Sequence, residues 1–367
     1  MKKIIEEVRN KLEMEKSNSK RFLLSNLYVT LFNQLDEKEK QEEMKYIKNI
    51  DLILEEVCYY DYLKNDAEIF EDFASKIDDR YKKTNFNFYS LYPENKLNIN
   101  EAKDIVFDIL NDIGIDNIEK LYDFDKIKYK KLDNAEGYCI NTFGLYKGNI
   151  VLSEDIDKIV IFIKDLIHEI GHNYENIFMS NMSSIQQIER YNYCFIEVCS
   201  SFFEKIALDY LIKKNIYMDD ANRELNNYYC DLYDRLMFLG NIRTNEDLEN
   251  AIYDDENIYI IEKDKNDKEN INTNENNNQN KQISFKKYNY DEDIKYGYGS
   301  LLGEYFFDIY KQDKKDGLKK LKNFLSNQGL LDERQMLETI KFKENNFSFL
   351  DKGLSDNMKY MRKRYKW

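Results

Sequence analysis

The sequence predicts a predominantly α-helical protein with one small β-hairpin or sheet. Two observations favour helices. The 367 residues include one proline and twelve glycines, too few for the many turns of an all-β fold. Apolar residues also recur at helical spacing, as at Phe22, Leu23, Leu27 and Leu31. A third observation supplies the sheet, because the segment 137–153 combines β-branched and aromatic residues with two glycines.

The helices fall into two predicted domains. Residues 1–98 form an N-terminal helical domain of three or four antiparallel helices, and the only proline, Pro93, lies in the connection that ends it. Residues 99–367 form the second domain, which opens with a short helix ending near Gly114. Later helices are expected at about 184–214, 217–239, 291–312, 314–326 and 333–365.

The hairpin segment leads into a helix that carries both histidines of the chain. Ser153 is expected to cap this helix, with Glu154 and Asp155 in its first turn, where acidic side chains are favoured. An apolar stripe follows at helical spacing and predicts a buried face: Ile156, Ile159, Val160, Ile163, Ile167 and Ile170.

One segment differs sharply in composition from the rest of the chain. Residues 262–287 include eight asparagines among 26 residues and only three bulky apolar side chains. Ordering such a segment would bury too little surface to offset the entropy lost. We therefore expect a mobile Asn-rich loop.

Charge and cysteine content exclude several classes of partner. The net charge of −14 disfavours non-specific attraction to nucleic acid or to an anionic membrane, so neither is expected as a partner. The longest aliphatic run, at 159–163, is far too short for a membrane span, and no signal-peptide pattern opens the chain. Five cysteines without a CxxC pair indicate reduced thiols and a cytoplasmic location.

The strongest functional signal is His168-Glu169-Ile-Gly-His172, an H-E-x-x-H motif within the predicted helix. Histidines four residues apart lie on one helix face, where both imidazoles can reach one metal ion beside the glutamate. The two histidines of the chain would fall into this pattern by chance in about 1 in 1,000 arrangements of this composition. The motif indicates a catalytic zinc site.

The third zinc ligand cannot be histidine, since the chain has no other, so a carboxylate is required. Glu197 is the best candidate, because it lies in an apolar segment where an acid is costly unless it is paired or bound to metal. Glu204 is seven residues further on and shares its helix face. We expect Glu204 either to orient a ligand imidazole or to serve as an ordinary structural acid.

These segments resemble the oligoendopeptidase F and thimet oligopeptidase family of zinc peptidases. His168-Glu-Ile-Gly-His172 is similar to the HExGH motif of that family, and Glu197-Val-Cys-Ser-Ser-Phe-Phe-Glu204 to its downstream E-x-x-S-x-x-x-E pattern. The resemblance covers about residues 135–310. It implies a zincin-like metallopeptidase architecture of the gluzincin type, one Zn²⁺ per chain on His168, His172 and Glu197, Glu169 as the base, and short peptides as substrates. Residues 1–98 would then form a lid over the substrate channel.

The stretch 288–304 resembles the tyrosine-bearing segment of the same family. On this resemblance Tyr298 would donate its hydroxyl to the oxyanion that forms during hydrolysis, and Tyr296 and Tyr290 would contact the substrate. Tyrosine is also a common core residue, so a structural role is the alternative for each. The glycines between them are expected to act as a hinge: Gly297, Gly299 and Gly303.

The sequence departs from the family pattern in two places. The family usually has a further histidine shortly before these tyrosines, and this chain has none. Family members are also usually longer before the hairpin, so the lid is expected to be smaller here.

The predicted function is a zinc-dependent endopeptidase acting on short peptides, with water activated by zinc and Glu169 and the oxyanion stabilised by Tyr298. One alternative is a catalytically silent zinc-binding or peptide-binding scaffold of the same fold, which would suit the missing histidine. A second alternative is a helical interaction protein in which the motif arose by chance.

Overall fold

The computed structural model describes residues 2–16, 18–36, 38–43, 45–46, 75, 92–114, 123, 127–132, 137–140, 149–177, 193–241, 290–328, 330–331, 333–341 and 348–365. The Asn-rich segment 262–287 lies outside these residues, as does most of the predicted helical region between 47 and 91. None of the helices in the described part of the chain combines the length and the apolar character that a bilayer crossing needs.

Helices dominate the described residues, and one small sheet precedes the helix with both histidines, as predicted. The elements are α1 (Lys2–Met14), α2 (Asn18–Asn33), α5 (Ile99–Ile113), β1 (Lys128–Lys130), β2 (Gly137–Ile140), β3 (Asn149–Ser153), α6 (Ile159–Asn176), the short 3-10 helix η3 (Tyr193–Phe195), α8 (Val198–Lys214), α9 (Met218–Asn241), α11 (Tyr290–Gln312), α12 (Lys314–Asn327), α13 (Glu333–Thr339) and α14 (Ser348–Tyr365).

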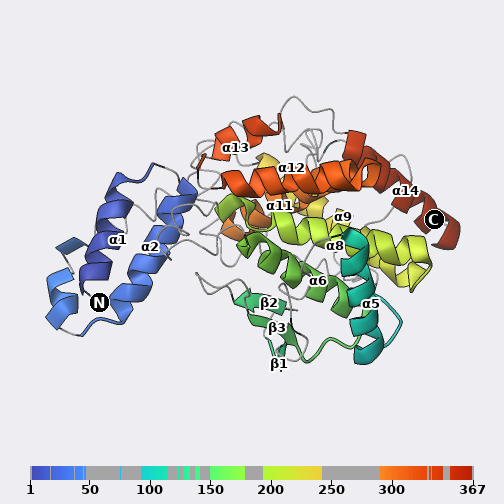
Figure 1. Ribbon diagram of the computed structural model, residues 1–367, viewed down its shortest axis with the longest axis horizontal. Coiled ribbons are helices and arrows are strands. Elements are labelled where there is room, and N and C mark those ends of the chain that lie inside the picture. Colours follow the sequence, from blue (N-terminus) through green and yellow to red (C-terminus); the bar gives the residue numbers. More distant parts are fainter. Residues whose placement is uncertain are drawn as a thin grey trace, which may run out of the picture.

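The larger part of the molecule is a stack of layers around α8. The sheet lies against α6, α6 packs on α8, α8 on α11, and α11 on α12, with α9 and α14 beside them (Figure 1). Buried side chains occur on every side of α8, among them Phe202, Phe203 and Leu208. A helix that is apolar all round belongs at the centre of a core, and α8 occupies that place.

The predicted hairpin is present and belongs to a three-stranded sheet. Strands β2 and β3 pair antiparallel, with Cys139 opposite Ile150. The missed strand, β1, pairs parallel to β3 on its other edge, with Tyr129 opposite Leu152, so the strand order is β1-β3-β2. β1 consists of Lys-Tyr-Lys, and its exposed side chains give no alternating pattern from which a strand could be predicted.

The predicted start of the histidine-bearing helix at Ser153 is wrong. Ser153 ends β3, and α6 begins at Ile159. Between them the chain makes a turn at Glu154 and Asp155 and reaches α6 through a bridge position at Lys158. The segment around Lys96 pairs with Lys158, and the carbonyl of Asn95 accepts the N–H of Ile159. These tertiary contacts override the local capping signal.

The predicted helix over 184–214 begins later than expected. α8 starts at Val198, after η3, and residues 178–192 lie outside the described part. Glu197 therefore occupies the N-cap position of α8 and not its interior. The predicted helix over 333–365 is also wrong as a single element, since α13 ends at Thr339 and α14 begins at Ser348.

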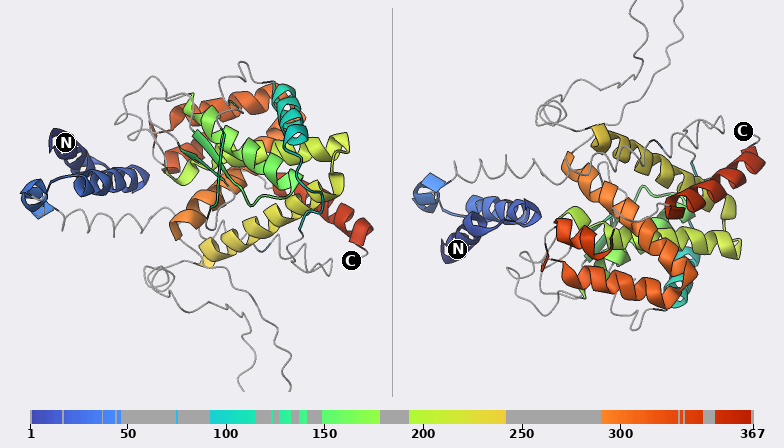
Figure 2. Two further views of the ribbon diagram at one scale, coloured as in Figure 1. Left: turned by 90° about the horizontal axis from the view of Figure 1, so that it is seen from below. Right: turned by 90° about the horizontal axis from the view of Figure 1, so that it is seen from above.

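The N-terminal helices α1 and α2 have a small apolar core of their own, in which Ile5, Val8 and Leu12 meet Leu24 and Tyr28. The buried Arg9 forms an ion pair with Glu43. In the views from below and above, α1 and α2 lie at one end of the molecule and the C-terminal end of α14 at the other (Figure 2). The assignment of residues 1–98 as a separate domain stays a prediction.

Candidate metal centre

Helix α6 places both histidines of the motif on one face, as their spacing predicts. The ring centroids of His168 and His172 lie 5.1 Å apart, and the ring planes stand at 80°. Both side chains are largely buried, with 17% and 12% of their surface exposed. The Nε2 atoms of the two rings approach the same oxygen on the neighbouring segment.

That oxygen belongs to Glu197. Its Oε2 lies 3.2 Å from Nε2 of His168 and 3.3 Å from Nε2 of His172. In a tetrahedral zinc site with bonds of about 2.1 Å, two ligand atoms lie about 3.4 Å apart. The three groups thus have the donor types and the spacing that zinc requires, and their donor atoms all lie within 4.8 Å of one another. The residues fit the metal ion that the sequence implies.

Ser200 holds Glu197 in this position. Its Oγ donates a hydrogen bond of 2.8 Å to Oε2 of Glu197 and lies 3.1 Å from the Glu197 carbonyl oxygen. Ser200 is fully buried and was not among the predicted site residues. A serine three residues after the ligand, in an apolar segment, is the signal that could have indicated it.

Glu204 lies on the Nδ1 side of His168, opposite the Nε2 atom that approaches Glu197. Its Oε2 is 3.4 Å from Nδ1 of His168. A carboxylate at Nδ1 favours the tautomer that leaves Nε2 free to bind metal. Burial opposes the charge of Glu204, but His168 and the nearby Lys164 outweigh it and lower the pKa of Glu204, so the carboxylate is anionic.

Glu169 stands beside the two histidines without binding them. Its carboxylate rests against Gly137 of β2 and accepts the backbone N–H of Cys139. Oε2 of Glu169 is buried and has no hydrogen-bond partner among the described residues. Burial raises the pKa of Glu169 above its ordinary value. A carboxylate with a free oxygen and a raised pKa is suited to accept a proton.

The charge of the cluster favours a cation. Burial would lower the pKa of both imidazoles, yet hydrogen bonds that His168 donates to Glu197 and Glu204 raise its pKa well above the ordinary range. At His172 the charge of Glu197 outweighs burial and raises the pKa of the imidazole. Burial likewise opposes the anionic form of Glu197, but the two histidines hold its pKa well below the usual value. The cluster accepts positive charge either as protons or as a metal ion.

Two glycines allow three helices to meet at this point. A Cβ on Gly171 would lie 2.7 Å from Cα of Ser200, so only glycine lets α6 approach α8 this closely. A Cβ on Gly299 would overlap Glu197. Gly297, Gly299 and Gly303 all lie inside the continuous helix α11. The hinge predicted from them is therefore wrong, and at Gly299 the absent side chain makes room for the ligand residue.

The predicted tyrosines lie along α11. Tyr298 is fully buried, with its ring edge-on to Phe195 at 5.5 Å. The half-buried Tyr296 lies under the guanidinium of Arg235, 4.9 Å from the ring centroid. Tyr290 is the first residue of α11, and its side chain is not among those described. Their predicted roles stay predictions.

Glu175 is a buried acid that the sequence did not indicate. It lies on α6 after His172, and its surroundings include Glu197, Gln328 and Cys199. Burial raises the pKa of Glu175 to about 8. The carboxyl is therefore neutral at pH 7 in the metal-free protein.

Replacing this acid is expected to change how stability depends on pH. The pKa of Glu175 is about 8 in the folded protein, and an unfolded glutamate titrates near 4.5. As pH rises between these values, the free energy of unfolding of the wild type falls by about 1.4 kcal/mol per pH unit. In EDTA, the melting temperature of Glu175→Gln should equal that of the wild type at pH 5 and exceed it at pH 9. Glu338→Gln, at an exposed position, is the control. If the melting temperatures of Glu175→Gln and the wild type differ by the same amount at pH 5 and pH 9, the raised pKa of Glu175 is contradicted.

Comparison with known proteins gives little further support. No protein-family model matches the sequence, and no curated protein matches it. Among solved structures, the chain is similar to a crystal structure assigned as an oligoendopeptidase F from Bacillus anthracis str. Ames. The two are 12% identical, the match covers 96% of this chain and 68% of that one, and the TM-score is 0.48. At this identity and TM-score the likeness establishes neither membership of a family nor an activity.

Proposed function

We propose that the protein is a zinc-dependent endopeptidase that hydrolyses peptide bonds in short peptides. The supporting observation is the meeting of both Nε2 atoms at Oε2 of Glu197, next to a second carboxylate with a free oxygen. Two imidazoles and one carboxylate leave the fourth tetrahedral position open, which distinguishes catalytic zinc sites from structural ones.

The chain supplies each group that peptide hydrolysis needs. When bound, a zinc ion supplies Lewis acidity, which lowers the pKa of water towards 7 and polarises a carbonyl group. Glu169 takes the proton of the attacking water at Oε2 and passes it to the leaving amine. Glu204 and Ser200 keep His168 and Glu197 in their binding orientations.

Two further parts of the proposal rest on the sequence resemblance. Tyr298 is assigned as the donor to the oxyanion. The close contact between its neighbour Gly299 and Glu197 supports this assignment. Residues 1–98 are assigned as a helical lid over the substrate channel and residues 99–367 as the catalytic domain.

The proposal is tested by metal content and peptide cleavage on the same samples. We expect one zinc per chain in the wild type by mass spectrometry, and cleavage of quenched-fluorescent peptides that EDTA abolishes. His172→Ala removes one of three ligands and should lose both zinc and cleavage. Zinc without cleavage of a wide peptide library would indicate the silent scaffold, and a metal-free wild type would reject the zinc site.

A further inference from the structure

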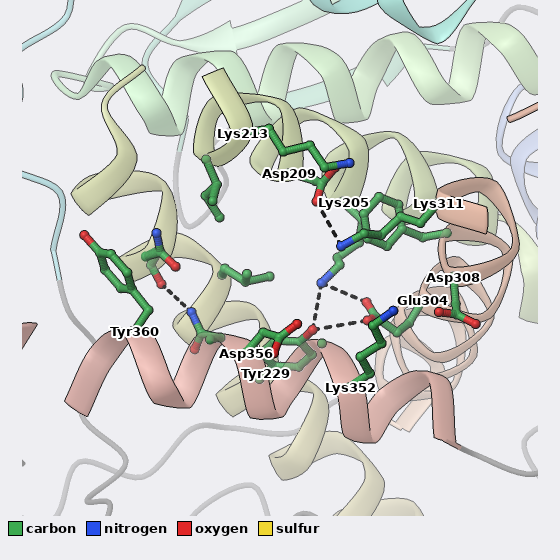
Figure 3. Close-up of a pocket in the computed structure, with 16 residues that line it drawn as sticks. Lys205, Asp209, Lys213, Tyr229, Glu304, Asp308, Lys311, Lys352, Asp356 and Tyr360 are labelled. Atoms are coloured by element: carbon green, nitrogen blue, oxygen red, sulfur yellow. Dashed lines mark hydrogen bonds and ion pairs between the residues drawn. The ribbon is translucent and has the colours of Figure 1, made fainter. Parts of the chain in front are cut away.

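A second site lies away from the metal centre. A cavity of about 370 Å³ opens where α8, α9, α11 and α14 meet (Figure 3). This volume is within the range of small-molecule pockets. None of the metal-centre residues lines it. Its α8 wall is formed by Lys205, Asp209, Ile212 and Lys213, which lie between about a quarter and half a turn around the helix from Glu204.

The inner wall of the cavity is a buried ion pair. Nζ of Lys205 lies 2.8 Å from Oε2 of Glu304 and donates to Oη of Tyr229 at 3.0 Å, and that hydroxyl donates to Glu304 at 3.1 Å. A Cβ on Gly353 would overlap Tyr229. The glycine therefore lets α14 pass close to this group without a side chain over it.

Two polar groups at the cavity have no partner among the described residues. Asn357 is 3% exposed, and its Nδ2 donates to the carbonyl of Asn222 at 3.1 Å. Its Oδ1 is buried and accepts no hydrogen bond. This oxygen is enclosed by protein atoms, so a ligand in the cavity does not reach it. Lys352, at the rim, forms no ion pair with any described residue.

The charges around the cavity balance. Four lysines and four acids line it: Lys205, Lys213, Lys311 and Lys352 against Asp209, Glu304, Asp308 and Asp356 (Figure 3). A polyanion would meet the acids and a polycation the lysines, so neither suits the site. Ile212, Leu225 and Phe307 add apolar wall. This lining is complementary to a small molecule with one positive group, one negative group and an apolar side chain.

We propose that this cavity binds an apolar amino acid or dipeptide as a zwitterion. Its ammonium group pairs with Asp356, its carboxylate pairs with Lys352 one helix turn away on α14, and its side chain lies against Leu225 and Phe307. The site is separate from the metal centre and does not rest on the proposed peptidase activity.

The test is calorimetric titration of the full chain with L-leucine. We expect one leucine per chain. N-acetylleucine, which lacks the ammonium group, and leucinamide, which lacks the carboxylate, should each bind about tenfold or more weakly, because each loses a charge-assisted contact. Lys352→Ala should weaken leucine binding by a similar factor and leave leucinamide binding unchanged. Leu225→Trp should fill the cavity and abolish binding.

Two further variants distinguish binding in this cavity from binding at the metal centre and from a general effect of lost positive charge. Lys363→Ala, an exposed lysine of α14 that does not line the cavity, should bind leucine like the wild type. His172→Ala should also bind it normally, whether or not the protein is a peptidase. Loss of binding in His172→Ala would place leucine at the metal centre and overturn the proposal. Undetectable binding to the wild type, or unchanged binding to Lys352→Ala and Leu225→Trp, would overturn it as well.

Discussion

Glu169→Gln is expected to keep its zinc and to lose peptide turnover, roughly 10²-fold to 10⁴-fold in kcat. Glutamine has the shape of glutamate but cannot take a proton from water. Oε2 of Glu169 has no hydrogen-bond partner in the described part of the chain, so the substitution breaks no hydrogen bond there. The ligands His168, His172 and Glu197 are untouched, and the metal should remain at one per chain.

The measurements are metal content, melting temperature, kcat and KM on the same preparation. Because burial disfavours the charge of Glu169, the neutral variant should melt at or above the wild-type temperature. Glu338→Gln, the same change at an exposed site, is the control and should leave all four quantities unaltered. Undiminished kcat in Glu169→Gln would remove this residue as the base, and loss of zinc would show that its role is structural.

The helical fold could be predicted because its signals are local. Scarce proline and glycine and the apolar spacing predicted α9, α11 and α12 to within a residue or two at most ends. At α12 the reason is visible, since the Asp313 side chain accepts the N–H groups of Lys315 and Asp316 and fixes the first turn. Such a cap depends on neighbours in sequence alone.

The errors arose where distant segments decide the local structure. Ser153 has the sequence of a helix cap, but pairing with Lys130 of β1 holds it at the end of a strand. The glycines of α11 suggest a hinge when they are considered alone. Gly299 lies against Glu197, about a hundred residues earlier in the chain, and only that contact explains it. No pattern within one segment contains this information.

The candidate site divides in the same way. His168, Glu169 and His172 form one turn of one helix, so their spacing alone predicts that they meet. Glu197 could be inferred because an acid in an apolar segment needs a partner. The Lys205–Glu304 pair could not be inferred, because its two members lie on different helices about a hundred residues apart, and neither segment identifies the partner.

Loss of the buried lysine is expected to be the most damaging change outside the metal centre. Lys205→Met should lower the free energy of unfolding by about 3–5 kcal/mol, because it leaves the Glu304 carboxylate buried without its cation. Both side chains of the pair are only 3% exposed. The lysine also lies 4.4 Å from the ring centroid of Tyr229, a contact that the variant loses.

The physical cause can be separated from loss of packing by a double variant measured in urea. Lys205→Met/Glu304→Leu removes both charges, and it should recover most of the stability because replacing a whole buried pair with apolar groups is often close to neutral. Lys213→Met is the matched control. The pair of Lys213 with Asp209 is at the surface, and 59% of the lysine side chain is exposed. The substitution should therefore lower the free energy of unfolding by less than about 1 kcal/mol. If the double variant is no more stable than Lys205→Met, packing around the lysine and not its charge holds these helices together.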